Sequence, residues 1–246
     1  MRLILLGTAG YHPNDRRQTQ CLLLPDCGVM LDAGTGLYRA TEYLRTAELD
    51  IYLTHAHLDH TIGLTYLLSV QRLHPLRRIT VHGLPEKLAV VRDHLFSEGL
   101  FPVAPPFELR PLVGEERLPG GGKLMHFSLE HRGGSVGFRL DWPGHSLAYV
   151  TDTTAALEAD YVAKIRGVDL LVHECYFADE QAELAKQFAH SSTSAVATVA
   201  REAGVKRLVM AHVCPMLPGD DPLGLARARA IFPATSLGED RMELEF

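Results

Sequence analysis

Residues 54–60 read Thr-His-Ala-His-Leu-Asp-His and directly follow the apolar run Ile51-Tyr52-Leu53. Three imidazoles and one carboxylate therefore lie within six positions, where a buried strand is predicted to end and a helix to begin. Imidazole and carboxylate suit Zn²⁺, Mn²⁺ or iron, and the lack of thiolates disfavours a structural zinc site. A loop that leaves a buried strand can direct such side chains to one place, whereas a regular strand would send them to both faces. The segment therefore predicts a metal site, and its candidate ligands are His55, His57, Asp59 and His60.

Apolar runs and helical patterns alternate on both sides of this segment. Strands are predicted at 3–6, 21–24, 29–31, 51–53, 79–81, 124–130, 135–140, 146–150, 170–172 and 207–210. Helices are predicted at 35–45, 61–70, 85–96, 192–202 and 222–230, and the Pro- and Gly-rich residues 99–122 are predicted to be irregular. Hairpin-like strand pairs occur beside strand–helix alternation, which indicates mixed sheets with helices outside them. No repeat or linker divides the chain, so residues 1–246 are predicted to form a single domain.

The composition is that of a globular protein with an acidic balance. The 246 residues are 46% hydrophobic and carry a formal net charge of −6, which argues against a generally basic nucleic-acid-binding surface. The apolar run at the N-terminus stops at Gly7, too early for a signal-peptide core, and no stretch approaches a membrane span. The four cysteines are scattered and lack C-x-x-C spacing. We therefore expect a protein of the reducing cytoplasm that makes no membrane contact.

The histidine segment resembles the signature of the metallo-β-lactamase superfamily. Further residues resemble the other motifs of that superfamily in the same order, and each stands just beyond a predicted apolar strand: Asp32, His131, Asp152 and His212. Together these motifs cover nearly the whole chain. The resemblance implies an α/β fold in the form of a four-layered αββα sandwich with two mixed β-sheets, and it places the metals at one edge of the sheets.

The resemblance also implies a role for each of these residues, and the cofactor it implies is two divalent ions. Zinc is the expected metal, with manganese or iron as alternatives. Asp32 would hold a metal-bound imidazole by a hydrogen bond. The implied ligands are His55, His57 and His131 for the first metal, Asp59, His60 and His212 for the second, and Asp152 shared between them.

Several of these residues also have a structural interpretation when they are taken alone. His131 and His212 would then be structural histidines. Asp152 would be the N-cap of a helix at 153–157, and Asp32 would be a turn former before Gly-Thr-Gly. The interpretation as ligands depends on the whole set.

A second pair of segments resembles the ribonuclease Z branch of the superfamily, which includes small phosphodiesterases. The segments are Val172-His173-Glu174-Cys175 and Ala189-His190-Ser191-Ser192-Thr193, and residues 6–10 resemble the Leu-Gly-Thr first turn of that branch. In the branch the later histidine, here His190, donates a proton to the leaving oxygen, and the glutamate, here Glu174, orients it. The branch continues with Ala-Thr where this chain has Cys175-Tyr176, so the match is partial.

The candidate catalytic residues are therefore Asp59, His190, Glu174 and Asp32. Two points stay open from the residues alone. His190 could instead be a polar residue beside a helix that Ser191 or Ser192 caps, and His173 could be functional or simply a histidine at a strand end.

One departure from the ribonuclease Z branch concerns the substrate. Those enzymes commonly carry a protruding arm, which grips tRNA, between the third histidine and the shared aspartate. Here only 20 residues separate His131 from Asp152, and hairpin strands are predicted to fill them. Together with the acidic balance, this argues against cleavage of precursor tRNA.

The sequence therefore predicts a metal-dependent phosphodiesterase that acts on a small or accessible phosphodiester, with RNA kept as a second substrate class. The alternatives are a tRNA 3′-processing endoribonuclease, a lactonase or thioesterase on the same site, and a metal-binding protein without hydrolytic activity. A β-lactamase is disfavoured because nothing implies export. A homodimer is expected only by analogy with the branch.

Overall fold

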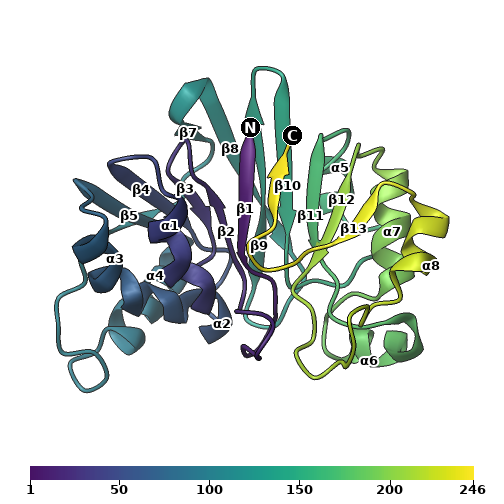
Figure 1. Ribbon diagram of the computed structural model, residues 1–246, viewed down its shortest axis with the longest axis horizontal. Coiled ribbons are helices and arrows are strands. Elements are labelled where there is room, and N and C mark those ends of the chain that lie inside the picture. Colours follow the sequence, from purple (N-terminus) through teal and green to yellow (C-terminus); the bar gives the residue numbers. More distant parts are fainter. The chain divides into compact units, whose positions relative to one another are not determined.

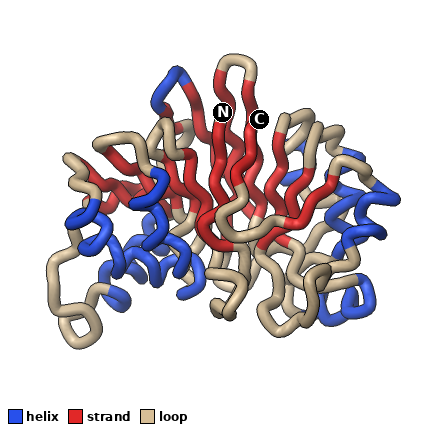
Figure 2. The backbone as a smooth tube through the Cα atoms, viewed as in Figure 1, coloured by secondary structure: helices blue, strands red, loops and turns tan.

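The computed structural model describes residues 1–246 and contains two compact units, each with its own β-sheet. Unit 1 comprises Met1–Gly114 and Asp240–Glu245, and unit 2 comprises Glu115–Glu239 and Phe246. Each unit holds a mixed seven-stranded sheet accompanied by helices (Figures 1 and 2). The predicted α/β class with two mixed sheets is therefore confirmed, and the single domain stays a prediction. None of the helices combines the length and the apolar character that crossing a membrane requires.

The sheet of unit 1 changes from antiparallel to parallel pairing along its width. Strands β14, β1, β2 and β3 pair antiparallel, whereas β3, β4, β5 and β6 pair parallel. The strands in sheet order are β14 (Glu243–Glu245), β1 (Arg2–Gly7), β2 (Cys21–Leu24), β3 (Val29–Leu31), β4 (Glu48–Tyr52), β5 (Arg78–Gly83) and β6 (Glu108–Pro111).

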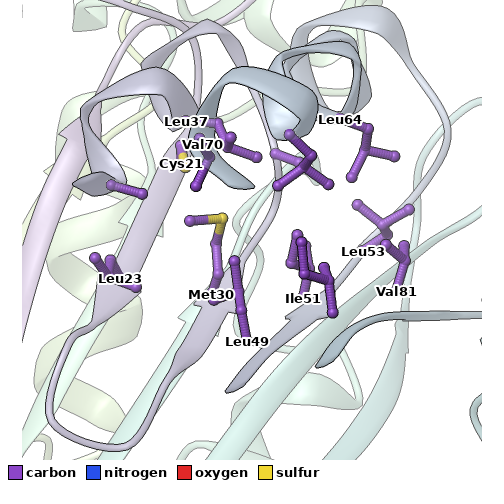
Figure 3. Close-up of a cluster of buried hydrophobic side chains, with 14 of the residues drawn as sticks. Cys21, Leu23, Met30, Leu37, Leu49, Ile51, Leu53, Leu64, Val70 and Val81 are labelled. Carbon is purple, nitrogen blue, oxygen red and sulfur yellow. The ribbon is translucent and has the colours of Figure 1, made fainter. Parts of the chain in front are cut away.

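Helices pack on one face of this sheet, where apolar side chains of the strands form a continuous buried surface. On β4, Leu49 and Ile51 contribute to a buried cluster that includes Met30 and Val81 (Figure 3). Shortening one of these side chains, as in Ile51→Ala, would destabilise the fold by about 2–5 kcal/mol. The helices of unit 1 are η1 (Thr35–Arg39), α1 (Ala40–Tyr43), α2 (Leu58–Thr61), η2 (Ile62–Tyr66), α3 (Leu67–Leu73), α4 (Pro85–Val90) and the π-helical turn Val91–Leu95.

The sheet of unit 2 has the same mixture of pairings. Strands β7 to β10 pair antiparallel in succession, and β10 to β13 pair parallel. The strands in sheet order are β13 (Thr235–Leu237), β12 (Leu208–Ala211), β11 (Leu170–Glu174), β10 (His145–Val150), β9 (Ser135–Trp142), β8 (Gly122–Leu129) and β7 (Glu116–Leu118). The helices are η4 (Pro119–Gly121), α5 (Tyr161–Lys164), η5 (Asp179–Gln181), α6 (Ala182–Gln187), α7 (Thr193–Glu202) and α8 (Leu225–Ile231).

Parallel pairing determines where the polar residues that follow the strands are placed. In unit 1, β3 and β4 end side by side, so Asp32 and Thr54 follow neighbouring strands. In unit 2, β10, β11 and β12 end side by side, which brings together Asp152, Glu174 and His212. The carboxyl ends of parallel strands are the usual position of functional residues in α/β sheets.

Candidate metal centre

A buried carboxylate organises the histidine segment of unit 1. Asp32 Oδ1 accepts hydrogen bonds from the Thr54 backbone N–H at 2.8 Å and from Thr54 Oγ1 at 2.9 Å. Its Oδ2 lies 2.7 Å from His60 Nδ1, and both side chains are fully buried. The carboxylate thus accepts from His60 Nδ1–H, so the lone pair of the neutral ring is on Nε2.

The same network determines the tautomer of His55. Thr54 Oγ1 uses its only proton on Asp32, so it accepts from His55 Nδ1–H, which lies at 3.0 Å. The lone pair of His55 is therefore on Nε2, and this atom lies 3.0 Å from His57 Nδ1. Ring nitrogens of two histidines converge on one point, as expected of two ligands of one metal.

Asp59 and His60 form a second pair in unit 1. Asp59 Oδ2 lies 3.4 Å from His60 Nε2 and accepts the backbone N–H of Tyr11 at 2.8 Å. A lone-pair nitrogen and a carboxylate oxygen at this separation repel each other unless a cation, either a proton or a metal ion, compensates them. The donor chemistry of this pair therefore fits a divalent cation.

In unit 2, the carboxylate of Asp152 lies between two histidines. Its Oδ2 is 3.5 Å from His131 Nε2, and its Oδ1 is 3.2 Å from His212 Nε2. The Thr151 hydroxyl also donates to Oδ1 at 2.7 Å. One oxygen is thus available to each histidine, which is the arrangement that a carboxylate shared by two cations would need.

The backbone is strained where these residues leave their strands. Asp32, Asp152 and His212 have φ angles of 58°, 37° and 57°, values that residues other than glycine rarely adopt. Residues 153–157 are not helical, and the next helix is α5 (Tyr161–Lys164). The alternative in which Asp152 caps a helix at 153–157 is therefore wrong.

Glu174 is a buried carboxylate that accepts hydrogen bonds from four donors. Oε1 accepts from Thr153 N–H and from His190 Nδ1–H, each at 3.0 Å. Oε2 accepts from the backbone N–H groups of Tyr176 at 3.1 Å and Ser191 at 3.3 Å. These donors compensate the charge of a side chain that is only 1% exposed.

His190 is oriented by Glu174 and faces the residues around Asp152. Because Nδ1–H donates to Glu174, Nε2 is the ring nitrogen that remains for contact with a substrate. One ligand atom each of Asp152, His190 and His212 lies within 4.8 Å of the others. Ser192 precedes α7 but makes no capping side-chain hydrogen bond, so the helix-cap interpretation gains no support.

His173 points away from this group. Its Nδ1–H donates to the Glu174 carbonyl oxygen at 2.7 Å, and its Nε2 accepts from the Tyr161 hydroxyl at 2.9 Å. Burial lowers the pKa of the His173 imidazole below its ordinary value, although the neighbouring Glu174 opposes this. His173 is therefore a neutral residue inside the fold that supports the backbone of Glu174.

A pocket of about 420 Å³ lies beside Asp152 in unit 2. Its walls include Thr153 and Tyr161 together with three acidic residues, Glu130, Glu158 and Asp160. Three carboxylates in the lining disfavour a polyanionic ligand in this pocket.

Several residues that support the site had no such role assigned to them from the sequence. Thr54 connects Asp32 to His55, Tyr11 holds Asp59 through its backbone, and the Ser191 hydroxyl donates to the Thr153 carbonyl at 2.7 Å. Thr54 could have been suspected because it directly precedes the histidines at the strand end. The backbone contact of Tyr11 leaves no mark on the choice of side chain.

Comparison with protein families and curated proteins gives consistent matches. The model of the family described as a β-lactamase superfamily domain matches residues 28–213. A ribonuclease Z of Salinibacter ruber is 30% identical over 99% of this chain and 94% of its own length. A ribonuclease Z of Bradyrhizobium sp. is 29% identical over 97% of both chains, in an alignment of 302 positions against 246 residues here. That relative therefore contains insertions that this chain lacks.

Solved structures with low sequence identity share the fold over its whole length. The metallo-β-lactamase fold protein YhfI of Bacillus subtilis has a TM-score of 0.79 and 18% identity, over 99% of both chains. The short form of human tRNase Z has a TM-score of 0.77 and 22% identity, over 100% of this chain and 99% of that one. A diphosphatase of the PhnP family has a TM-score of 0.75 and 19% identity, over 100% and 97%.

Proposed function

We propose that this chain, which belongs to the ribonuclease Z-like branch of the β-lactamase superfamily, hydrolyses phosphodiester bonds with the help of divalent metal ions. The family match, together with the shared fold, confirms the expected metallo-β-lactamase sandwich as the fold class. The single observation that carries the proposal is the hydrogen bond of 3.0 Å between Glu174 and His190, with His190 close to Asp152 and His212. This arrangement provides a proton donor for a leaving oxygen.

The metals proposed are two ions of zinc per chain, with manganese or iron as alternatives. The lone-pair nitrogens and carboxylate oxygens described above fit such ions in both units. When bound, two divalent ions supply an activated hydroxide near neutral pH and positive charge for the phosphoryl oxygens. We propose His55, His57 and His131 as ligands of one ion, Asp59, His60 and His212 as ligands of the other, and Asp152 as the shared ligand.

The residues of the chain account for the departure of the leaving group. Glu174 accepts from Nδ1–H of His190 and so favours the imidazolium form, which carries a second proton on Nε2. As the P–O bond breaks, the leaving oxygen takes this proton, and the ring returns to its neutral Nδ1–H form. Asp32 acts through His60, whose Nδ1 it holds.

Three observations favour a small phosphodiester over a structured RNA. The formal net charge is −6, and the pocket beside Asp152 has acidic walls. The segment between His131 and Asp152 consists of β9, β10 and their turns, with no arm. The names of the curated relatives favour tRNA 3′ processing as the second candidate function, because those relatives are called ribonuclease Z.

The remaining expectations keep the status of predictions. A thioesterase would share the metals but releases a thiolate, which leaves without a proton donor, so the Glu174–His190 pair speaks against it. A lactonase stays an alternative on the same site. We propose that both units form one catalytic domain, since the family match at residues 28–213 includes parts of both. A homodimer and a cytoplasmic location stay predictions.

The experiment that tests the function is a panel of substrates given to zinc-reconstituted protein. It compares a bis-aryl phosphate, a cyclic nucleotide, a dinucleotide, a precursor tRNA, an aryl ester and a lactone. We expect the phosphodiesters to be hydrolysed, and we expect a chelator to abolish this hydrolysis. Hydrolysis of only the ester or the lactone would contradict the proposal.

A further inference from the structure

We propose that Tyr176 is a positioning residue that fixes the imidazole of His190 from its face. The two rings are stacked, with centroids 4.5 Å apart and an interplanar angle of 16°. This inference rests on the proposed function, because it takes His190 as the proton donor. Tyr176 stands where the ribonuclease Z branch has threonine, so the contact is a property of this chain rather than of the motif that surrounds it.

The backbone of Tyr176 is held independently of its side chain. Its N–H donates to Glu174 Oε2 at 3.1 Å and to the Ser191 carbonyl at 3.2 Å, and its carbonyl accepts from Cys214 N–H at 3.1 Å. A substitution that changes the ring can therefore leave these three hydrogen bonds in place. The test variants then report on the ring and not on the position of Glu174.

The ring itself is fixed by its surroundings. Phe177 packs edge-on against it, with centroids 4.8 Å apart, and Cys214 and Ala185 belong to the same small buried cluster. Tyr176 is only 7% exposed. A ring held in this way gives His190 a rigid surface rather than a mobile one.

Two contacts at right angles define the orientation of His190. The hydrogen bond to Glu174 lies in the plane of the imidazole, and by itself it permits the ring to rotate about the line from Nδ1 to Oε1. The stacked phenol blocks this rotation, because the imidazole would have to move into it. With both contacts, Nε2 keeps a single direction, within the group that His190 forms with Asp152 and His212.

The inference predicts an effect that depends on the leaving group. A proton donor that points in the wrong direction matters when the leaving oxygen is a poor one, and it matters little when a nitrophenolate leaves. Stacking of this kind contributes the equivalent of about a 2- to 30-fold change in rate. We therefore expect Tyr176→Thr to lower kcat for a dinucleotide about 5- to 30-fold, with less than about a threefold change for a bis-nitrophenyl phosphate and little change in KM.

The experiment compares Tyr176→Thr, Tyr176→Phe and the control Phe188→Ala on both substrates. Tyr176→Phe keeps the ring and should restore the dinucleotide rate. Phe188 is another aromatic residue, two positions before His190, but it is 49% exposed. Phe188→Ala should therefore leave the ratio of the rates with the two substrates unchanged. A double-mutant cycle adds His190→Ala, and Tyr176→Thr should have no further effect in that background.

A second readout needs neither metal nor turnover. In chelated protein with labelled histidine, the ring current of Tyr176 should shift the ring proton resonances of His190 upfield. The resonance is identified by its absence in His190→Ala. The shift should disappear in Tyr176→Thr and persist in Tyr176→Phe.

The possible outcomes separate the two proposals. If His190→Ala discriminates between the leaving groups but Tyr176→Thr leaves the dinucleotide rate and the ring shift unchanged, the inference alone is wrong. An effect of Tyr176→Thr that is undiminished in the His190→Ala background would also overturn it, because Tyr176 would then act elsewhere. If no phosphodiester is hydrolysed, the proposed function fails, whereas the ring shift still decides whether Tyr176 fixes the imidazole.

Discussion

Asp32 Oδ2 lies 2.7 Å from His60 Nδ1, and neither side chain is accessible to solvent. Unit 1 holds a second carboxylate–histidine pair, in which Asp50 Oδ1 lies 2.9 Å from His82 Nε2 and neither residue is a candidate ligand. Removing the carboxylate from each pair in turn separates the effect of a lost histidine partner on folding from its effect on metal binding.

We predict that Asp32→Asn weakens binding of one zinc ion by about 10- to 100-fold, since His60 would lose the carboxylate that orients it and raises its basicity. Competition with a chromogenic chelator measures the affinity. Asp50→Asn is the matched control, and it should lower stability without changing zinc affinity. Equal losses of affinity in the two variants would show that both act through the fold.

Asp152→Ala should abolish turnover and reduce the metal content below two ions per chain, because the charge that keeps two cations close is lost. Elemental analysis after reconstitution and circular dichroism give the metal content and the fold. Asp141→Asn, which removes a carboxylate that binds Arg139 on β9, should keep both ions. Near-normal rates with two ions bound to Asp152→Ala would exclude Asp152 as the shared ligand.

His190→Ala should slow alkyl or nucleotide diesters by about 10²–10⁴-fold and activated aryl diesters far less. Steady-state kinetics with a series of leaving groups gives the dependence. The metal content should not change. Loss of an ion from the variant would instead make His190 a ligand, and equal slowing of all substrates would point to a role in binding.

Glu174→Gln should show the same dependence on the leaving group in weaker form, because an amide still orients His190 but no longer favours its charged ring. It should also lower Tm, since the amide nitrogen cannot accept the hydrogen bonds that one carboxylate oxygen now receives from backbone N–H groups. Thermal unfolding and the leaving-group series measure the two effects. An unchanged Tm would mean that those N–H groups find other acceptors.

Precursor tRNA should be cleaved poorly at physiological salt, because the chain lacks an arm and carries net negative charge. The measurement compares trailer removal with hydrolysis of a bis-aryl phosphate by the same preparation. Efficient cleavage at the 3′ end of the tRNA would mean that another surface replaces the arm.

Stability should fall as the pH drops below the ordinary histidine value, partly through His173. Burial lowers the pKa of His173 in the folded chain, so the unfolded chain binds a proton that the folded chain does not. The free energy of unfolding should thus decrease from about pH 6.5 downwards, by up to about 1.4 kcal/mol per pH unit for one group. Urea titrations of chelated protein at pH 7.5 and 5.5 measure this. His173→Gln, which keeps an acceptor for Tyr161, should lose less stability over this interval than the wild type does.

The fold class and the polar residues that follow the strands could be predicted from the sequence, because both depend on local patterns of apolar and polar residues. His55 to His60 follow an apolar run, and Asp32 follows another. Strand β6 (Glu108–Pro111) was missed because it pairs on one side only, and an edge strand tolerates proline and lacks a buried alternating pattern. Strands β13 and β14, three residues each, are too short to show a period.

Contacts between residues that are distant in the sequence could not be predicted, for a different reason. The stacking of Tyr176 on His190 depends on where the loop after β11 meets the loop before α7. The residue spacing within either loop does not indicate that the two loops come into contact. The hydrogen bond from Tyr11 to Asp59 is likewise made by the backbone, so any residue type except proline could donate it at position 11.

The last strand of the chain has a consequence for biosynthesis. β14 pairs with β1, and just before it Asp240 accepts hydrogen bonds from Thr8 and Arg39 (Figure 1). Once residues 1–114 have left the ribosome, their sheet still has an open β1 edge, and the partly buried Arg39 still lacks its carboxylate partner. Such an edge can pair with other chains. Unit 1 is completed only when Asp240–Glu245 have been made, so its β1 edge stays unpaired while the residues of unit 2 are being synthesised.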